Sequence, residues 1–367
     1  MNDLTKDAGR RPNCDLLIYI LGLSGGAGRN AVNYANTLAD AGLRVALAYG
    51  SGKGWGLDAS LDSRVTRCCL KSARNLRSIP ALTALLRRTD PARALVIGPS
   101  NMVPFRISAL LAGYSGPVDW RVSNSPTGLL AGYPGWKRAV KKPMFARALR
   151  RADRLIALNP ALARELHETW QVPRDRITVI PNGVALPNMS ERPAPRVPPV
   201  ILCVARLQPQ KDHATLLRAF ALLRKRKACR LQLAGDGSLK TELERLTDKL
   251  EIRSEVDFLG HVHETTELYL QASITVLSSR FEGFPNVLIE SLAHGTPVVA
   301  TDCPSGPAEV IDSPSVGLLC EPGNADQLAD RLEQALDTEY RPEDLRARAA
   351  VFSDVETARL IRTMYCS

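Results

Sequence analysis

The chain has 367 residues, of which 45% are hydrophobic, 23% are charged and 5% are aromatic, and its formal net charge at pH 7 is +10. This length exceeds the usual ceiling for a single hydrophobic core, so two domains of ordinary size are expected. The composition excludes a disordered chain and a disulfide-dense mini-domain, and no apolar run reaches the roughly 18 residues that a membrane-spanning helix needs.

The first half of the chain alternates apolar segments with helical patterns. Asp15–Leu21 is apolar without alternation, which is typical of a strand buried on both faces. Residues 30–42 carry apolar side chains at helical spacing and end in a glycine. This order of segments predicts a parallel, doubly wound sheet. Further strands are expected at 44–49, 94–98, 118–124 and 154–159, and a helix at 78–91.

Five prolines between Pro187 and Pro199 predict a linker, after which the alternation restarts. We therefore expect two Rossmann-like domains facing across a cleft, at residues 1–186 and 200–350, and a C-terminal helix at 351–367 that crosses back to the first domain. The strands of the second domain are expected at 200–205, 230–235, 256–260, 274–279, 297–302 and 317–322, and its helices at 212–227, 239–250, 265–273, 286–295 and 325–337.

The segment before the first strand carries acidic as well as basic residues, so it does not resemble a secretory signal. The eight cysteines form no C-x-x-C pair, which leaves zinc ribbons and thioredoxin-like redox motifs without support. We expect an intracellular, cytoplasmic protein with small buried thiols.

The net charge is unevenly divided along the chain. Residues 1–190 contain 27 Lys and Arg against 12 Asp and Glu, which gives +15, and residues 191–367 carry −5. A basic half usually meets an anionic partner, such as a membrane surface, a nucleic acid or a phosphorylated ligand.

Two carboxylates lie eight positions apart in the second half. A strand at 274–277 leads into a loop with Glu282, and a helix expected from Asn286 carries Glu290. Ligands of open α/β sheets bind at the carboxyl ends of strands, where a helix N-terminus favours anions. Gly283 and Pro285 would turn backbone N–H groups toward such a ligand. On spacing alone, an ordinary loop with two solvated glutamates is an equal alternative.

This segment resembles the Glu-x7-Glu signature of retaining, GT-B-fold glycosyltransferases of the family 4 type. Three more segments agree with that family in order and spacing, and the resemblance covers roughly residues 150–325 well. It implies an acceptor-binding N-terminal domain and a donor-binding C-terminal domain. The three segments are "VIPNGV" at 179–184, "VARLQPQKD" at 204–212, and "LAGDGSLKTELE" at 233–244 with the "VDFLG" that follows.

The resemblance implies that a sugar moves, with retention, from a nucleotide-diphosphate donor of UDP type to a hydroxyl of a lipid-linked or cell-envelope glycan. Arg206 and Lys211 would stabilise the charge that develops on the diphosphate. Glu290 would accept hydrogen bonds from the ribose, and Glu282 would hold the donor sugar, so Glu282, Arg206 and Lys211 are the expected catalytic residues. The expected substrate-binding residues are Gly25, Gly26, Arg121, Asn124, Asn182, Gly283, Phe284, Pro285, Asn286, Val287 and Glu290.

No metal or other cofactor is expected. The chain has no Asp-x-Asp motif, and its five histidines show no ligand pattern with carboxylates. His261 and His263 form a tempting pair, but a solvent-lined loop is the favoured interpretation. Arg121 and Asn124 stand where many members of the family carry a histidine that contacts the donor sugar, and a structural ion pair of Arg121 is an equal alternative.

The glycine turn after the first strand allows a different function. Gly26 and Gly28 match the dinucleotide fingerprint formally, which would suit an NAD(P)-dependent oxidoreductase. The acidic residue expected at the end of the next strand is absent. A non-catalytic nucleotide-sugar-binding subunit is the other alternative to a transferase.

The segment Lys137–Arg154 concentrates basic residues. Met144, Phe145, Ala148 and Leu149 interleave with them, as in a helix that lies on an anionic membrane. A solvated face of an ordinary packed helix is the alternative. Nucleic-acid binding is not expected, since aromatic interleaving and a known module are both lacking.

Overall fold

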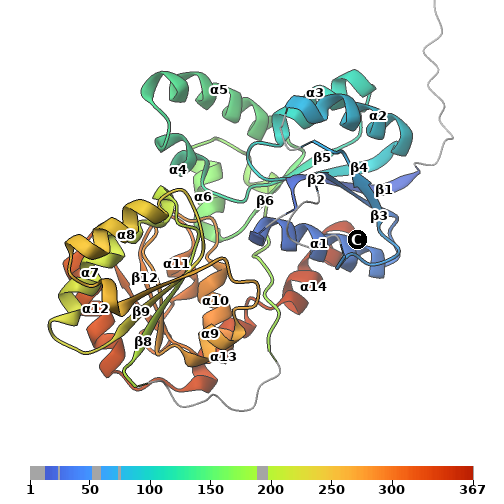
Figure 1. Cartoon of the computed structure of the whole chain (residues 1–367). Helices are drawn as coiled ribbons and strands as arrows, with labels where there is room; N and C mark the ends of the chain where they lie inside the picture. The colour runs from blue at the N-terminus through green and yellow to red at the C-terminus, as the bar shows by residue number, and fades with distance from the viewer. Residues whose placement is uncertain (1–12, 24, 52–58, 73–75, 188–196, 367) are drawn as a thin grey trace, which may run out of the picture. The chain divides into compact units, whose positions relative to one another are not determined.

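The structure, a computed structural model, describes residues 13–23, 25–51, 59–72, 76–187 and 197–366. These form two compact units, one within residues 1–180 and 358–367, the other from Pro181 to Thr357 (Figure 1). We call them unit 1 and unit 2. Most of the proline-rich segment predicted as a linker, residues 188–196, lies outside the described residues.

Unit 1 is built on a parallel sheet in the order β3-β2-β1-β4-β5-β6-β7. The first strand lies inside the sheet, and the chain winds outward from it in both directions, as predicted for a doubly wound domain. The strands are β1 (Cys14–Gly22), β2 (Val45–Ser51), β3 (Thr66–Cys69), β4 (Pro91–Ile97), β5 (Val118–Arg121), β6 (Arg154–Ala157) and β7 (Ile177–Val179).

Helices cover both faces of this sheet. Successive side chains of a strand point to opposite faces, and since β1 carries buried apolar side chains on both, both faces must be covered. Ile18 on β1 joins a core with Leu38 of the first helix, whereas Tyr19 faces the other layer, where its ring lies 6.0 Å from that of Phe105. The helices are α1 (Gly25–Asp40), η1 (Leu76–Ser78), α2 (Ile79–Thr89), α3 (Met102–Ala112), α4 (Pro126–Ala131), α5 (Gly135–Arg151), α6 (Pro160–Glu168) and η2 (Arg174–Arg176).

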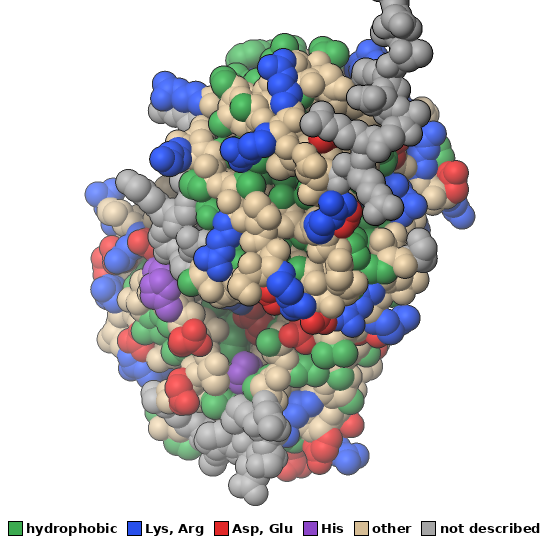
Figure 2. Space-filling model, turned by 90° about the vertical axis from the view of Figure 1, so that its right-hand side faces the viewer, with side chains coloured by type: hydrophobic (Ala, Val, Ile, Leu, Met, Phe, Trp, Pro, Cys, Tyr) green, Lys and Arg blue, Asp and Glu red, His purple; other side chains and the backbone are tan. Residues whose placement is uncertain are grey.

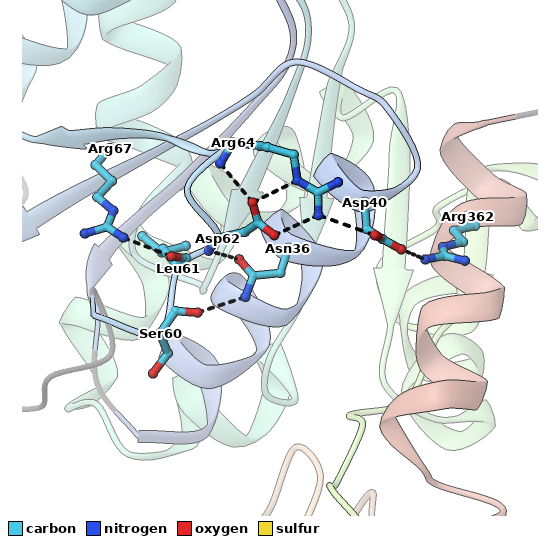
Figure 3. A network of polar contacts seen from close by, with 8 residues as sticks. All are labelled: Asn36, Asp40, Ser60, Leu61, Asp62, Arg64, Arg67 and Arg362. Atoms are coloured by element: carbon cyan, nitrogen blue, oxygen red, sulfur yellow. Dashed lines mark hydrogen bonds and ion pairs between the residues drawn. The ribbon is translucent and has the colours of Figure 1, made fainter.

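The last helix, α14 (Asp354–Tyr365), begins in unit 2 and ends in unit 1. Ile361 is 1% exposed in the core that it shares with α1, and Arg154 donates a hydrogen bond of 3.1 Å to the carbonyl of Met364. Arg362 also reaches Asp40 at the end of α1, over 2.5 Å (Figure 3). Because both side chains of this ion pair are about half exposed, the buried apolar contact contributes more to the docking.

Unit 2 is built on a second parallel sheet, in the order β10-β9-β8-β11-β12-β13. Its first strand, β8, lies between β9 and β11, so the chain reverses its winding direction at this point. The predicted α/β class with doubly wound parallel sheets is confirmed for both units. The strands are β8 (Val200–Val204), β9 (Arg230–Ala234), β10 (Val256–Gly260), β11 (Ile274–Leu277), β12 (Val298–Thr301) and β13 (Gly317–Cys320).

The main core of unit 2 lies between one sheet face and the layer of α7, α8 and α12 (Figure 1). Ile201 and Cys203 of β8 point into it, and Leu202 between them faces a smaller cluster with Tyr269. The helices of unit 2 are η3 (Pro209–Lys211), α7 (His213–Arg224), α8 (Lys240–Lys249), η4 (Arg253–Glu255), α9 (Thr266–Gln271), α10 (Asn286–Ala293), α11 (Pro307–Val310), α12 (Ala325–Asp337) and α13 (Pro342–Ala350).

The elements that sequence reasoning did not assign include β3, β7, α3 and α6. The two strands lie at the edges of their sheet and have only four and three residues, too few for a periodicity to emerge. Helix α3 is apolar on several sides, so its pattern lacks the polar face by which helices are recognised.

His213, the first residue of α7, is a buried titratable group. It is 1% exposed, and neither ring nitrogen has a hydrogen-bond partner among the described residues. Burial, helped by the charge of Lys211 and opposed by Asp212, lowers its pKa from 6.5 to about 4. The ring is therefore neutral at pH 7.

We predict that His213 makes unit 2 acid-sensitive. Its pKa is lower in the folded chain than in the unfolded one, so the unfolded chain takes up the proton first and stability falls as the pH drops from 6.5 toward 4. Between pH 7 and pH 5 the wild type should lose about 2 kcal/mol more unfolding free energy than His213→Leu, measured by urea denaturation. Equal losses in both proteins would contradict the prediction.

Cysteine accessibility offers a second test of the fold. Burial raises the pKa of the thiols of Cys203 and Cys303 to about 12, which suppresses the reactive thiolate. Of the eight cysteines only Cys69 and Cys366 are exposed. Iodoacetamide should label these two rapidly in the folded protein and all eight in urea, as read by peptide mass spectrometry. Rapid labelling of Cys203 without denaturant would contradict the fold.

Candidate functional site

The candidate site of unit 2 follows from strand order. Strands β8 and β11 are parallel neighbours, so the loops after Val204 and Leu277 emerge at the same edge of the sheet. The chain reverses its winding direction between these strands, and ligands of open α/β sheets bind at such a switch point. The first loop carries Arg206 and Lys211, and the second carries Glu282.

Hydrogen bonds fasten the two loops to each other. The side-chain amide of Gln210 donates to the carbonyl of Phe281 over 2.8 Å, and the backbone N–H of Arg280 donates to the carbonyl of Gln210 over 2.9 Å. The hydroxyl of Ser278 donates to the carbonyl of Lys211 over 2.8 Å. The backbone around both charged residues is thus fixed before any ligand arrives.

Lys211 and Glu282 form an ion pair across the two loops. Lys211 Nζ lies 2.5 Å from Glu282 Oε1, and the two side chains are 17% and 6% exposed. The hydroxyl of Ser279 donates to the same oxygen over 2.5 Å. A carboxylate this deeply buried is stable only when it is paired and hydrogen-bonded, and these contacts supply both.

Arg206 lies on the same edge of the sheet, but its environment differs from that of the Lys211–Glu282 pair. Its side chain is exposed and makes no hydrogen bond or ion pair with the described residues, so the guanidinium can bind an anion. Two glycines of the loop after β9 support its backbone. A Cβ on Gly235 would lie 2.0 Å from the carbonyl oxygen of Ala205, and one on Gly237 would lie 2.3 Å from that of Leu207. Only glycine permits this close packing.

Helix α10 begins directly after the Glu282 loop. Its first turn has no acidic side chain and its N-terminus no side-chain cap, so the helix dipole favours an anion there. Asn286 accepts a hydrogen bond of 2.6 Å from the side chain of Asn182. Phe284, 8% exposed, packs edge-on against Phe352. Of the other predicted residues, Gly283 and Pro285 are buried and Val287 is half-buried.

Glu290 lies half-buried on α10, and a phenol holds its carboxylate. Tyr269 of α9 donates a hydrogen bond of 2.8 Å to Glu290 Oε2, and its ring stacks on that of His294. Sequence reasoning had not singled out Tyr269 or Ser279. Their positions carry no motif, and only the packing of α9 beside α10 and the turn after β11 bring them to the two glutamates.

Unit 1 contains the remaining predicted residues. Gly25 and Gly26 open α1, directly after the segment that follows β1. Arg121 is 1% exposed, and its Nε donates to the hydroxyl of Tyr34 over 3.1 Å, a deep position for a substrate contact. Asn124 is half-buried. The assignment of these four residues to a substrate remains a prediction.

The histidine pair noticed in the sequence forms a contact of its own. The rings of His261 and His263 lie 4.6 Å apart, edge to face, on the loop after β10. Across the described part of the chain, no group of three or more His, Cys, Asp or Glu side chains is arranged to hold a metal ion.

Helix α5, in the basic segment, protrudes in its first half. Every residue from Ala131 to Val140 is exposed, whereas Leu149 is buried and the ring of Phe145 lies 6.3 Å from that of Trp120. The sequence had grouped Met144 with Phe145 and Leu149 as one apolar face. The structure divides them, because Phe145 and Leu149 pack inward and Met144 remains 48% exposed.

The exposed apolar side chains of α5 form a stripe. Trp136, Val140 and Met144 follow one another at four-residue spacing and are 69%, 59% and 48% exposed. The ammonium group of Lys137 lies 5.2 Å from the ring centroid of Trp136. On the face drawn in Figure 2, Lys and Arg side chains are scattered, and several of them lie beside Asp or Glu side chains. None of the helices in the described residues is both long and apolar enough to cross a membrane.

Comparison with known proteins identifies the family of this chain. The model described as Glycosyltransferase Family 4 matches residues 24–186, and the one described as Glycosyl transferases group 1 matches residues 188–351. The structure of HepE from Anabaena, in complex with UDP and glucose, is 18% identical with a TM-score of 0.79, and the match covers 96% of this chain and all of HepE.

Two bacterial proteins illustrate the sequence relatives. The N-acetylgalactosamine-N,N'-diacetylbacillosaminyl-diphospho-undecaprenol 4-alpha-N-acetylgalactosaminyltransferase of Campylobacter jejuni is 29% identical over 228 residues, or 60% of this chain and 62% of that protein. The lipopolysaccharide core biosynthesis glycosyltransferase LpsE of Rhizobium meliloti is 27% identical over 324 residues, 86% of this chain and 87% of LpsE. The match thus spans less than two thirds of the Campylobacter protein. Together the two matched models cover most of the sequence: the chain belongs to the group 1, family 4 glycosyltransferases and has their GT-B fold.

Proposed function

We propose that the protein is a retaining glycosyltransferase that moves a sugar from a nucleotide-diphosphate donor to a hydroxyl of a lipid-linked or cell-envelope glycan. The observation that carries this proposal is the arrangement at the edge of unit 2. There the exposed Arg206, the Lys211–Glu282 ion pair and the start of α10 follow two adjacent parallel strands. Cations, a fixed carboxylate and a helix N-terminus at one edge suit a sugar joined to a diphosphate.

The chemistry needs stabilisation of the leaving group. As the bond between the sugar and the diphosphate breaks, negative charge builds on the phosphate oxygens. Arg206 and Lys211 stabilise that charge in the transition state. Glu282 accepts hydrogen bonds from the donor sugar. Its carboxylate is buried and bound to fixed partners, so its oxygens have a defined orientation. The hydroxyl of the acceptor attacks the face of the sugar that the diphosphate leaves, and its proton passes to the departing phosphate oxygen.

The identity of the substrates is inferred from relatives. HepE carries UDP and glucose in its structure, which favours a UDP-sugar donor here. The Campylobacter relative is named for an undecaprenol-diphosphate-linked acceptor, and LpsE for lipopolysaccharide core biosynthesis. A lipid-linked or envelope glycan is the acceptor class that these names support. Family membership weighs against an oxidoreductase that would use Gly26 and Gly28 for a dinucleotide.

We predict that Glu282→Ala and Arg206→Ala each lower the rate of sugar transfer at least ~100-fold, because each removes a group that contacts the reacting donor. The measurement is release of UDP from a panel of UDP-sugars in the presence of bacterial membrane lipids. Arg218→Ala, an exposed arginine on α7 of the same unit, is the matched control and should retain full activity.

Three results would refute the proposed function. Unchanged transfer in both variants would remove Glu282 and Arg206 from the reaction. Binding of UDP without turnover of any donor would favour the non-catalytic subunit. A thermal-shift response to NADPH, in place of UDP or GDP, would favour the oxidoreductase.

We further infer that α5 places the enzyme on an anionic membrane, where a lipid-linked acceptor would reside. The stripe of Trp136, Val140 and Met144 supplies apolar side chains for the interface, and neighbouring cations supply attraction to lipid phosphates. The exposed cations on α5 are Lys137, Arg138, Lys142, Arg147, Arg150 and Arg151.

We predict that the protein sediments with vesicles that contain phosphatidylglycerol and stays in solution with pure phosphatidylcholine. Lys137→Glu with Lys142→Glu should weaken vesicle binding at least tenfold, since each basic residue near the surface contributes about 1 kcal/mol. Trp136→Ala with Met144→Ala should weaken it too, through lost apolar burial. Val355→Ala, 76% exposed in unit 2, is the control and should bind as the wild type. Equal binding by all variants would contradict this role of α5.

A further inference from the structure

We propose that Tyr269 is a positioning residue that fixes the carboxylate of Glu290 for recognition of the ribose of the donor nucleotide. The inference rests on the proposed function, in which Glu290 accepts hydrogen bonds from ribose hydroxyls. It adds the residue that decides where those acceptor oxygens lie.

The contact itself is direct and shielded. The phenol oxygen of Tyr269 donates to Glu290 Oε2 over 2.8 Å, and Tyr269 is 1% exposed, so water does not compete for its hydroxyl. A hydrogen bond to an ionised carboxylate is roughly twice as strong as one between neutral groups. The carboxylate, which sits on a half-buried side chain with several rotatable bonds, is thereby restricted to one orientation.

Tyr269 is in turn held through both its ring and its backbone. Its ring stacks on that of His294 with the centroids 5.3 Å apart, and it packs against Leu202 of β8 and Ala234 of β9. The hydroxyl of Thr296 donates to the carbonyl of Tyr269 over 2.6 Å. The ring of Tyr269 therefore connects the carboxylate of Glu290 to the sheet, and the sheet fixes where that carboxylate lies.

His294 ties the same residues together at the other end of α10. Its Nδ1 lies 2.7 Å from the backbone carbonyl of Glu290, one helical turn earlier, and the ring is 8% exposed. The imidazole can therefore donate to Glu290 while its face supports Tyr269. Both the backbone and the carboxylate of Glu290 are in this way held by side chains that lie outside the Glu-x7-Glu segment.

A fixed carboxylate matters most for a ligand with two adjacent hydroxyls. The ribose 2′- and 3′-hydroxyls present a pair of donors at fixed separation, and an acceptor bound in a defined orientation loses less entropy when it meets them. Without the phenol, Glu290 samples other rotamers, and the discrimination between ribose and deoxyribose weakens.

The test measures ribose recognition in the whole protein. Kd values are measured by calorimetry for UDP and 2′-deoxy-UDP, and in parallel for GDP and 2′-deoxy-GDP. Wild type should prefer the ribonucleotide. In Tyr269→Phe this preference should fall about tenfold, the size expected for one hydrogen bond to a charged group. The KM for the donor should rise by a similar factor, while kcat changes little.

Two further variants separate the possible outcomes. Glu290→Ala should abolish the ribose preference, and Tyr340→Phe, which removes a phenol hydroxyl from another part of unit 2, should leave it intact. Loss of the preference in Glu290→Ala but not in Tyr269→Phe would overturn the positioning role alone. A preference that survives Glu290→Ala would overturn both this inference and the ribose role of Glu290 in the proposed function. A drop of kcat in Tyr269→Phe with unchanged ribose preference would indicate a merely structural residue and would also overturn it.

Discussion

The parallel pairing of β8 with β11 is the constraint on which the candidate site depends. These strands are 70 residues apart in sequence, and each is buried between helical layers. Because they run in the same direction, the loops that leave them must open at the same edge. Lys211 and Glu282 meet there for this reason, although neither local sequence indicates that the two residues lie close together.

The same constraint explains why the edge is built from polar contacts. A glutamate that is 5% exposed would be unstable without partners, and Lys211 and Ser279 provide them. Hydrogen bonds from the side chains of Gln210 and Ser278 to backbone carbonyls then hold the two loops against each other. The resulting surface is rigid, with its charges placed before a ligand binds, which limits the reorganisation that catalysis requires.

Much of this could be predicted from the sequence. The Glu-x7-Glu segment indicated both glutamates, and the strand that precedes it was predicted to begin at Ile274, as observed for β11. The partners of these glutamates could not be predicted, because Tyr269 and Ser279 reach them only through the packing of α9, α10 and the turn after β11. The division of α5 into inward and outward apolar residues was also missed, since hydrophobicity alone does not distinguish a side chain that packs from one that protrudes.

The sequence by itself determined the alternation of strands and helices, the doubly wound class and the identity of the charged residues, because these depend on local periodicity and on which side chains the chain contains. Only the tertiary structure decided which charges meet, which are exposed and which are confined to a core. Arg121 and Arg206 illustrate the difference, because they occupy similar places in the sequence. Arg121 is the last residue of β5, and Arg206 comes just after β8. Arg206 is exposed, whereas Arg121 is buried against Tyr34 with 1% of its surface exposed. Burial is set by the neighbouring helices and not by the residue type.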